Sequence, residues 1–288
     1  MNGYNTAGGR GIWAFVMALG LVVIGLPSML GMLGMGATHP DAEPAAPERP
    51  AGYLFRTLEH NGASYPYSVY VPRDLERAAE ADGRGVRGLI FLHGYGECGT
   101  DGSKPLAVGL PPAMMLEPGR WPFVVVIPQK PRGDAEWEDF DDAVLAMLDA
   151  AIAEFGIDPG RVAITGLSQG GHGAIQFASM HGDRFRAAAP VCGYVQRFWE
   201  DGKRNSRPKP EWAARSAFAE SFEGTPVWLL HGGKDNVVPP AESEWLHEAL
   251  QDAGMTSKLT VFPNDNHNSW DSAYRQSGLW EWLVDQTR

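Results

Sequence analysis

The stretch Arg161-Val-Ala-Ile-Thr-Gly-Leu-Ser-Gln-Gly-Gly171 carries the strongest signal in this 288-residue chain. Its first half is apolar and β-branched, which favours a buried strand, and an apolar helix is predicted from about 171 to 181. The pattern Gly166-x-Ser168-x-Gly170 lies between them. Such a turn strains the serine backbone and exposes its hydroxyl, and the glycines leave room for the crossing strand and helix. We therefore expect Ser168 to be a nucleophile; the alternative is an ordinary Gly/Ser turn.

A nucleophilic serine needs a histidine that takes its proton and an acid that orients the histidine. The chain offers Asp235 and then His267, each on a loop just after an apolar run fit for a buried strand. Loops after parallel strands share one edge of an open sheet, so we expect these two side chains to meet Ser168 there. Two competing acids lie close to His267 in the sequence and are expected to cap its loop instead: Asp265 and Asp271.

Acyl transfer also needs two N–H donors directed at the oxyanion of the tetrahedral intermediate. One is expected from Gln169, the residue after the nucleophile. The other is expected from the turn His93-Gly-Tyr-Gly-Glu97, which follows another buried apolar run. We assign it to the N–H of Tyr95, with the N–H of Gly94 as the second choice.

The same turn matches a dinucleotide-binding fingerprint, Gly94-x-Gly96-x-x-Gly99, but its context does not. That fingerprint requires a helix that opens at the third glycine. Here the third glycine is followed by the loop residues Thr-Asp-Gly-Ser-Lys-Pro. The sequence contains no CxxC or HExxH metal motif. We therefore expect no cofactor and no metal.

Strand and helix signals alternate along most of the chain. A hairpin is predicted around Asn61-Gly62. Further strands are predicted at 87–92, 123–128, 161–165, 186–191, 226–231 and 258–262, and helices near 138–155, 170–181, 240–253 and 271–284. Continuous apolar runs separated by helices are typical of a mostly parallel sheet with helices on both faces. We expect an α/β fold with about eight strands.

Several blocks of the sequence resemble one superfamily. They are Leu92-His-Gly-Tyr-Gly-Glu97, Ile127-Pro-Gln129, Thr165-Gly-Leu-Ser-Gln-Gly-Gly171, Asp183-Arg-Phe-Arg-Ala-Ala-Ala-Pro-Val-Cys-Gly193, His231-Gly-Gly-Lys-Asp235 and His267-Asn-Ser-Trp270. They make residues 53–288 similar to the α/β-hydrolase superfamily. The likeness is strongest to its peptidase/esterase branch, near phospholipase/carboxylesterases, dienelactone hydrolase-like proteins and feruloyl or acetyl-xylan esterases. The resemblance implies an α/β-hydrolase fold. Members of this branch often have Glu-Arg where this chain has Glu97-Cys98.

The substrate pocket is less well marked. Four residues near the expected site are candidates for it, with core or loop packing as an open alternative for each: Gln129, Trp137, His172 and Trp270. The aromatic-rich segment 194–224 breaks the strand–helix alternation. We interpret it as a lid insertion, and a surface helix pair that packs its own aromatic side chains is the alternative.

The N-terminal region has a different composition from the rest. Residues 12–35 are apolar and uncharged, and they are long enough to span a membrane, although Pro27 and several glycines disfavour a straight helix. Two main interpretations of residues 1–37 stay open, a cleaved signal peptide and a membrane anchor, and an apolar N-terminus on a cytosolic protein is a third. A Pro-rich linker is predicted over 38–52, followed by the hydrolase domain, 53–288. Both main interpretations predict an extracytoplasmic, periplasmic or secreted, location.

The charge of the chain bears on its partners, and its cysteines bear on disulfide formation. The net charge is −11 and the acidic residues are spread along the chain, which argues against a nucleic-acid partner. The two cysteines, Cys98 and Cys192, fall in loops on the expected catalytic edge. We expect free thiols, with a disulfide as the alternative that export would permit.

These observations predict a serine hydrolase that cleaves carboxylic esters through an acyl-enzyme. Its substrate is expected to be a small-molecule or polysaccharide-linked ester. Two alternatives stay open: a peptidase or acyltransferase that uses the same triad, and a non-catalytic, membrane-tethered binding protein that keeps the fold. The acyl and alcohol groups of the substrate and the oligomeric state are not specified by the sequence.

Overall fold

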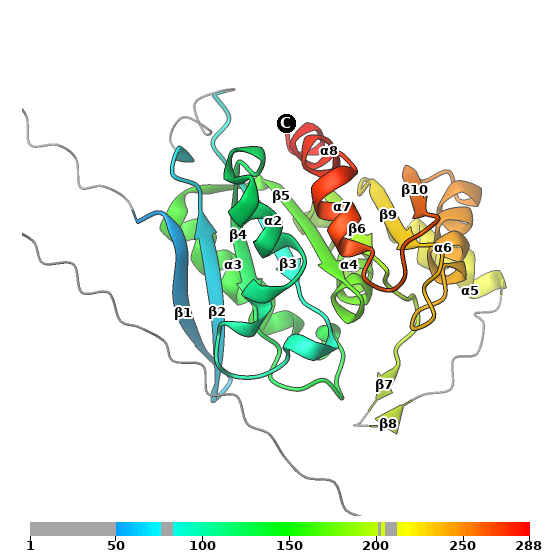
Figure 1. The fold of residues 1–288 in the computed structure, drawn as a ribbon, viewed down its shortest axis with the longest axis horizontal. Coiled ribbons are helices and arrows are strands. Elements are labelled where there is room, and N and C mark those ends of the chain that lie inside the picture. Colours follow the sequence, from blue (N-terminus) through cyan, green and yellow to red (C-terminus); the bar gives the residue numbers. More distant parts are fainter. Residues whose placement is uncertain (1–49, 76–82, 201–202, 205–211) are drawn as a thin grey trace, which may run out of the picture. The chain divides into compact units, whose positions relative to one another are not determined.

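The computed structural model describes residues 50–75, 83–200, 203–204 and 212–288 (Figure 1). The expected signal or anchor segment, 1–37, and nearly all of the expected linker, 38–52, lie outside the described residues. Within the described part of the chain, no helix is both long enough and apolar enough to cross a membrane. Because residues 12–35 lie outside the described part, their membrane and export interpretations stay predictions.

An eight-stranded sheet forms the centre of the domain, in the order β1-β2-β4-β3-β5-β6-β9-β10. Its strands are β1 (Gly52–His60), β2 (Ala63–Val71), β3 (Val86–Leu92), β4 (Phe123–Pro128), β5 (Ile157–Leu167), β6 (Ala187–Val191), β9 (Val227–Gly232) and β10 (Ser257–Phe262). β2 pairs antiparallel with β1 and β4, and the other neighbours pair in parallel. The predicted mostly parallel sheet of about eight strands is confirmed. So is the hairpin turn, where Asn61 and Gly62 have φ of 48° and 76°.

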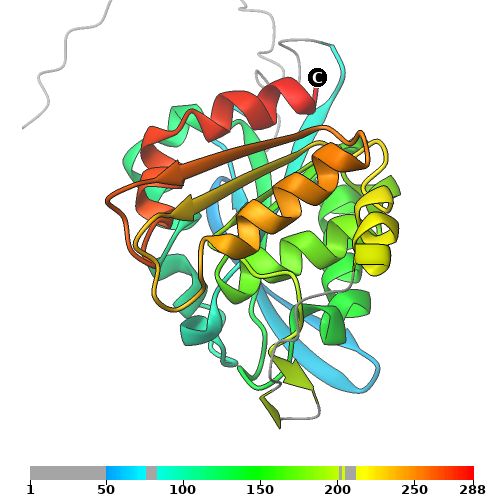
Figure 2. The same cartoon turned by 90° about the vertical axis from the view of Figure 1, so that its right-hand side faces the viewer.

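Helices cover both faces of the sheet (Figures 1 and 2). One face carries α3 (Asp141–Phe155), α4 (Gln169–Met180) and α6 (Ala241–Asp252), and the other carries α2 (Leu110–Leu116), α7 (Trp270–Gln276) and α8 (Leu279–Gln286). Alternate residues of β3 join opposite cores: Ile90 packs with the first set and Phe91 with the second. Because both faces are covered, the central strands are apolar throughout rather than alternating.

Two predicted elements differ in the structure. The single helix predicted over 271–284 is wrong, because Gly278 adopts a left-handed conformation (φ 77°) and separates α7 from α8. The expected helix near 138–155 is preceded by a short 3-10 turn, η4 (Trp137–Phe140), before α3 begins. Four more 3-10 turns occur in the loops: η1 (Tyr95–Glu97), η2 (Lys104–Ala107), η3 (Pro118–Arg120) and η5 (Gly182–Arg184).

The segment 194–224 divides into two parts with different environments. It contains the short strands β7 (Trp199–Glu200) and β8 (Lys203–Arg204) and the helix α5 (Trp212–Glu220). Ala219 and Phe222, at and after the end of α5, are buried in the core beside α6. Among the described residues, the second half therefore packs into the domain core through one helix, and it does not form the surface helix pair of the alternative interpretation. The first half lies over the site described next.

Candidate active site

Ser168 lies on a sharp turn between the end of β5 and the start of α4. Its φ of 55° and ψ of −116° are unusual for a residue with a Cβ, so the backbone is strained there. Two glycines permit the turn. A Cβ at Gly166 would lie 2.2 Å from the carbonyl oxygen of Gly170, and one at Gly170 would lie 2.0 Å from that of Leu92. The pattern of glycines around the serine thus follows from the close approach of β5, α4 and β3.

The structure brings Ser168, His267 and Asp235 into one hydrogen-bonded row. His267 Nε2 lies 2.9 Å from Ser168 Oγ, and His267 Nδ1 lies 2.7 Å from Asp235 Oδ2. Asp235 follows β9 and His267 follows β10, so both extend from the same sheet edge as the turn after β5. Neither competing acid joins this row: Asp271 Oδ2 accepts a hydrogen bond from Asn268, and Asp265 Oδ2 is buried without a hydrogen-bond partner among the described residues.

The carboxylate of Asp235 is held in its charged form. Burial alone raises its pKa, but hydrogen bonds from His231, His267 and the N–H groups of Val238 and Val237 outweigh burial and keep the pKa well below its usual range. His231 Nε2 is 3.3 Å from Asp235 Oδ2, while its Nδ1 is 2.7 Å from Ser243 Oγ. The His231 ring is fully buried behind the carboxylate, a position that suits a structural role.

Two N–H donors flank Ser168. Gln169 is the first residue of α4 and Tyr95 is the first residue of η1, so neither N–H has an intrahelical partner. Both residues line the same cavity as Ser168. The second choice, Gly94, is engaged differently, because its N–H donates to Glu97 Oε2 at 3.0 Å. The backbone N–H groups of Tyr95 and Gln169, rather than that of Gly94, are therefore the two candidates for binding an oxyanion.

An apolar cavity of about 390 Å³ opens beside this row of side chains. Its walls combine aromatic, aliphatic and backbone groups: Gly94, Tyr95, Gly96, Glu97, Val108, Leu167, Ser168, Gln169, Tyr194, Phe198, Trp199, Val237, Val238, His267 and Trp270. Trp270 packs edge-on against the His267 ring, with centroids 5.6 Å apart. Of the four candidate pocket residues, Trp270 is the one that lines this cavity.

The other three candidates lie beneath the cavity and brace its loops. Gln129 is buried, accepts a hydrogen bond from the Gly102 N–H (2.6 Å) and donates to the Glu97 carbonyl (3.0 Å). The Trp137 indole N–H donates to the carbonyl of His93 (3.1 Å). The His172 ring stacks against Tyr194, and its Nδ1 lies 2.9 Å from the Tyr194 carbonyl oxygen. For these three residues the packing alternative describes the structure.

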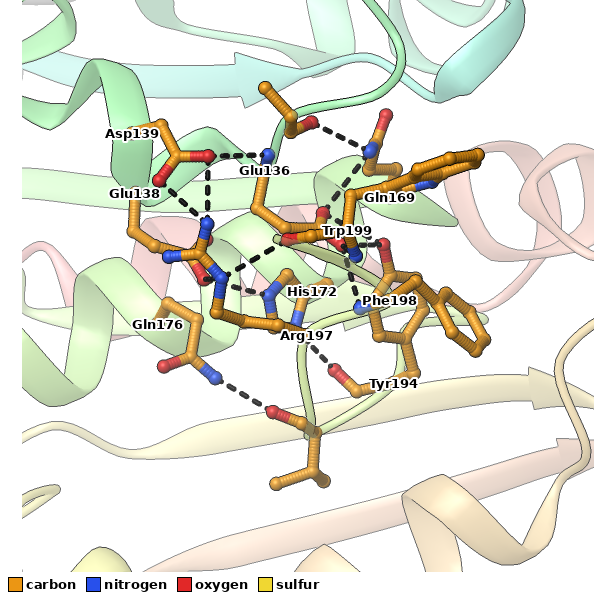
Figure 3. Close-up of polar contacts among 12 residues, drawn as sticks. Glu136, Glu138, Asp139, Gln169, His172, Gln176, Tyr194, Arg197, Phe198 and Trp199 are labelled. Atoms are coloured by element: carbon orange, nitrogen blue, oxygen red, sulfur yellow. Dashed lines mark hydrogen bonds and ion pairs between the residues drawn. The ribbon is translucent and has the colours of Figure 1, made fainter. Parts of the chain in front are cut away.

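The sequence did not reveal one residue of the site, Glu136, and it placed the aromatic residues Tyr194, Phe198 and Trp199 only within a broad lid. Glu136 is fully buried next to Gln169 and these aromatic residues (Figure 3). A glutamate in a loop with Gly133 and Asp134 has the composition of an exposed turn, so no local signal distinguishes it. Tyr194, Phe198 and Trp199 reach the cavity because the chain leaving β6 crosses above Ser168.

Both cysteines are free thiols. Among the described residues, Cys192, Asp235 and His267 form one group whose potential metal-ligand atoms lie within 4.8 Å of one another. Asp235 and His267 already bond to each other through those atoms. Burial raises the pKa of the Cys192 thiol to about 12, so the thiolate that a metal requires is disfavoured at neutral pH. The row is therefore better suited to proton transfer than to holding a metal.

Comparisons with known proteins agree with this geometry. The family model of the prolyl oligopeptidase family matches residues 129–288, more than half of the chain. An uncharacterized peptidase of Bacillus subtilis, YuxL, is 31% identical over 153 residues, which cover 48% of this chain and 23% of the relative. The acylamino-acid-releasing enzyme of Arabidopsis thaliana is 32% identical over 153 residues, covering 45% of this chain and 20% of that protein. The chain thus spans about a quarter or less of the length of these relatives.

The solved structure of a thermostable esterase superposes with a TM-score of 0.64 at 26% identity, covering 82% of this chain and 63% of that one. The sheet order, the strained serine and this superposition confirm the α/β-hydrolase fold that the sequence blocks imply. The match over 129–288 includes Ser168, Asp235 and His267, and the chain belongs to the prolyl oligopeptidase family.

Proposed function

We propose that this protein is a serine hydrolase that cleaves carboxylic esters through an acyl-enzyme on Ser168. His267 Nε2 accepts the proton of the Ser168 hydroxyl as Oγ attacks the ester carbonyl, and it then donates that proton to the leaving alkoxide. Asp235 holds the Nδ1–H tautomer of His267 and stabilises the imidazolium. The N–H groups of Tyr95 and Gln169 stabilise the oxyanion. Water, activated by His267, then hydrolyses the acyl-enzyme and restores Ser168.

One observation carries this proposal: the hydrogen-bonded row from Asp235 through His267 to Ser168 lies at the mouth of an apolar cavity. A binding protein that had lost catalysis would not need the strained backbone at Ser168 or the alignment of all three side chains. The row therefore supports an enzyme over the non-catalytic alternative.

The cavity supports an ester with an apolar group. Aromatic rings of Tyr95, Tyr194, Phe198 and Trp199 line the cavity together with Ser168. Glu97 is the one carboxylate among the residues that line it, and none of them is a lysine or an arginine, so most of the wall suits an apolar group. A small-molecule ester, or an ester-linked substituent of a polysaccharide, fits an opening of this kind.

A peptidase activity is the second candidate, and the family match favours it. Two relatives are named as a peptidase and as an acylamino-acid-releasing enzyme, whereas the superposed structure is named as an esterase. The same row of side chains serves amide hydrolysis, which requires protonation of a poorer leaving group. A panel of p-nitrophenyl esters and acyl-amino-acid p-nitroanilides, with an added alcohol to detect acyl transfer, separates the candidates.

The first test is the change Ser168→Ala. We expect hydrolysis of p-nitrophenyl acetate to fall by at least about three orders of magnitude, because the acyl-enzyme cannot form. Labelling by a fluorophosphonate should be lost as well. The control is Ser179→Ala, which removes a serine near the far end of α4 and should leave both readouts unchanged. Turnover or labelling that persists in Ser168→Ala would reject Ser168 as the nucleophile.

A further inference from the structure

The wall of the cavity above Ser168 is a short stretch of chain after β6, residues 194–199, here named the wall segment. It contributes three aromatic residues to the cavity: Tyr194, Phe198 and Trp199. Two of these rings pack on each other, and the third packs on Tyr95, a proposed oxyanion donor. Tyr194 and Phe198 have centroids 4.0 Å apart, and the Trp199 ring stacks on Tyr95 at 6.1 Å. The wall segment therefore shapes the part of the cavity that a bulky substrate group would occupy.

Acidic residues around η4 hold the wall segment in place (Figure 3). The carboxylate of Glu136 accepts hydrogen bonds from the N–H of Phe198 (2.8 Å), the N–H of Trp199 (3.0 Å) and the hydroxyl of Tyr194 (2.9 and 3.0 Å). Glu136 is 0% exposed. A buried carboxylate is costly unless donors surround it, so movement of the wall segment would leave this charge unsatisfied.

The same carboxylate reaches the residue after the nucleophile. The side-chain Nε2 of Gln169 lies 3.1 Å from Glu136 Oε2, and it also lies within 3.0 Å of the carbonyl oxygens of Gly133 and Ala135. The backbone N–H of Gln169 is one of the two proposed oxyanion donors. Glu136 thus joins the wall of the cavity to the residue that supplies an oxyanion donor.

Further charged side chains hold the outer side of the wall segment. Arg197 binds both oxygens of Asp139 (2.6 and 2.8 Å) and lies 3.5 Å from Glu138. Glu138 in turn accepts from His172 Nε2 at 3.2 Å, beneath the Tyr194 ring. Asp139 also accepts the N–H of Glu136 (2.9 Å). These contacts orient Glu136 and Arg197 from two directions, so the wall segment has one defined position.

We propose that Glu136 is a positioning residue that fixes the aromatic wall and the Gln169 oxyanion donor in one geometry, and that it thereby determines the preference for substrates with a bulky apolar group. This inference rests on the proposed ester hydrolysis at Ser168. It predicts that disturbing Glu136 impairs bulky substrates more than small ones, because only a bulky group depends on the wall for binding.

The experiment is the change Glu136→Gln, which keeps the shape but replaces one acceptor oxygen by an amide donor that faces other N–H groups. Two substrate pairs differ by a phenyl group: p-nitrophenyl 3-phenylpropanoate and p-nitrophenyl propanoate for the acyl side, phenylethyl acetate and ethyl acetate for the alcohol side. In at least one pair we expect kcat/KM for the bulky ester to fall by about ten- to hundred-fold through a higher KM. The small ester should lose clearly less, and mainly in kcat.

Matched variants separate positioning from general damage. Asp134→Asn removes the same charge from the same loop at an acid whose side chain is 46% exposed, and it should change neither pair. Tyr194→Phe removes one donor to Glu136 and keeps the ring, so it should shift the bulky-to-small ratio in the same direction by a smaller factor. It also serves as the test if Glu136→Gln does not fold. An equal loss for bulky and small esters, or no loss, would overturn the inference.

Failure of the proposed function has a different signature. Fluorophosphonates with a methyl or a phenylethyl substituent label the nucleophile without any turnover. If no ester is hydrolysed, the ratio of their labelling rates still reports the wall. A smaller preference for the phenylethyl reagent in Glu136→Gln than in the wild type supports the inference, and an unchanged ratio rejects it. Absence of labelling at Ser168 in the wild type would reject both proposals.

Discussion

At the scale of single residues, Asp235 has the most constrained environment in the proposed triad. Its Oδ1 accepts two backbone N–H groups, from Val237 and Val238, and its Oδ2 faces His267. The two N–H donors prevent the carboxylate from rotating, so one oxygen always points at Nδ1 of His267. The orientation of His267 toward Ser168 therefore depends on the turn that follows β9.

The change Asp235→Asn tests this dependence. The amide oxygen should keep the two backbone bonds, which directs the NH₂ group at His267 and stabilises the tautomer with the proton on Nε2. That tautomer cannot accept the Ser168 proton, so we expect kcat to fall by about four orders of magnitude. Steady-state ester hydrolysis measures it. Asp271→Asn, at an exposed acid near His267 in the sequence, should retain full activity, and the reverse pattern would move the acid role to Asp271.

At the scale of elements, the end of β3 carries both a proposed oxyanion donor and a buried histidine that affects the stability of the fold. His93 follows β3 and is completely buried beneath the loop that carries Tyr95. Its Nδ1 lies 2.6 Å from the Gly94 carbonyl oxygen. Its Nε2 lies 3.0 Å from the backbone nitrogen of Lys130 and accepts the hydrogen bond that this N–H group donates. Only the neutral ring with a proton on Nδ1 satisfies both contacts. Burial lowers the pKa of His93 to about 3, and the nearby charge of Lys130 acts in the same direction.

This environment predicts an acid-sensitive fold. Below pH 6.5 the unfolded chain protonates His93, whereas the native ring stays neutral until about pH 3, so the unfolded state gains protons. The free energy of unfolding should fall by about 1.4 kcal/mol per pH unit on this account. Urea unfolding between pH 7 and pH 4 measures the slope. In His93→Gln, which cannot take up that proton, the profile should be flatter, and parallel profiles for the two proteins would contradict the assignment.

At the scale of the whole molecule, the proposed site is built by one compact unit. Residues 49–288 contain the complete sheet, the helices on both faces and every residue of the site. Ser168, Asp235 and His267 follow β5, β9 and β10, and the carboxyl ends of these parallel strands lie at one edge of the sheet. No side chain from residues 1–48 is needed to complete the hydrogen-bonded row.

A chain that begins at Arg49 should therefore fold and keep the proposed ester hydrolysis of the 288-residue chain. The physical reason is that the unit has its own core and its own site. Circular dichroism and p-nitrophenyl acetate turnover of both forms check this expectation. A folded but inactive short form would show that the N-terminal residues act in catalysis. The predicted role of residues 12–35 in export or anchoring is tested separately, by cell fractionation of the 288-residue chain.

What the sequence by itself determined is whatever depends on local chemistry. The glycines around Ser168 follow from close backbone approach, the Asn61-Gly62 turn follows from positive φ, and the apolar runs follow from burial on both faces. The order of serine, acid and histidine indicated the three residues that meet at the sheet edge. Gly278 also carried a local signal, for the break between α7 and α8, and it was missed.

Only the tertiary structure decided the contacts that join distant segments. Gln129, Trp137 and His172 brace loops beneath the cavity rather than line it, because their partners come from other elements. The burial of Glu136 depends on the wall segment, some sixty residues further along the chain, whose N–H groups surround the carboxylate. Hydrophobic periodicity reports which face of an element is covered, but it does not report which donors meet a buried charge, since those donors are assembled only when the chain has folded.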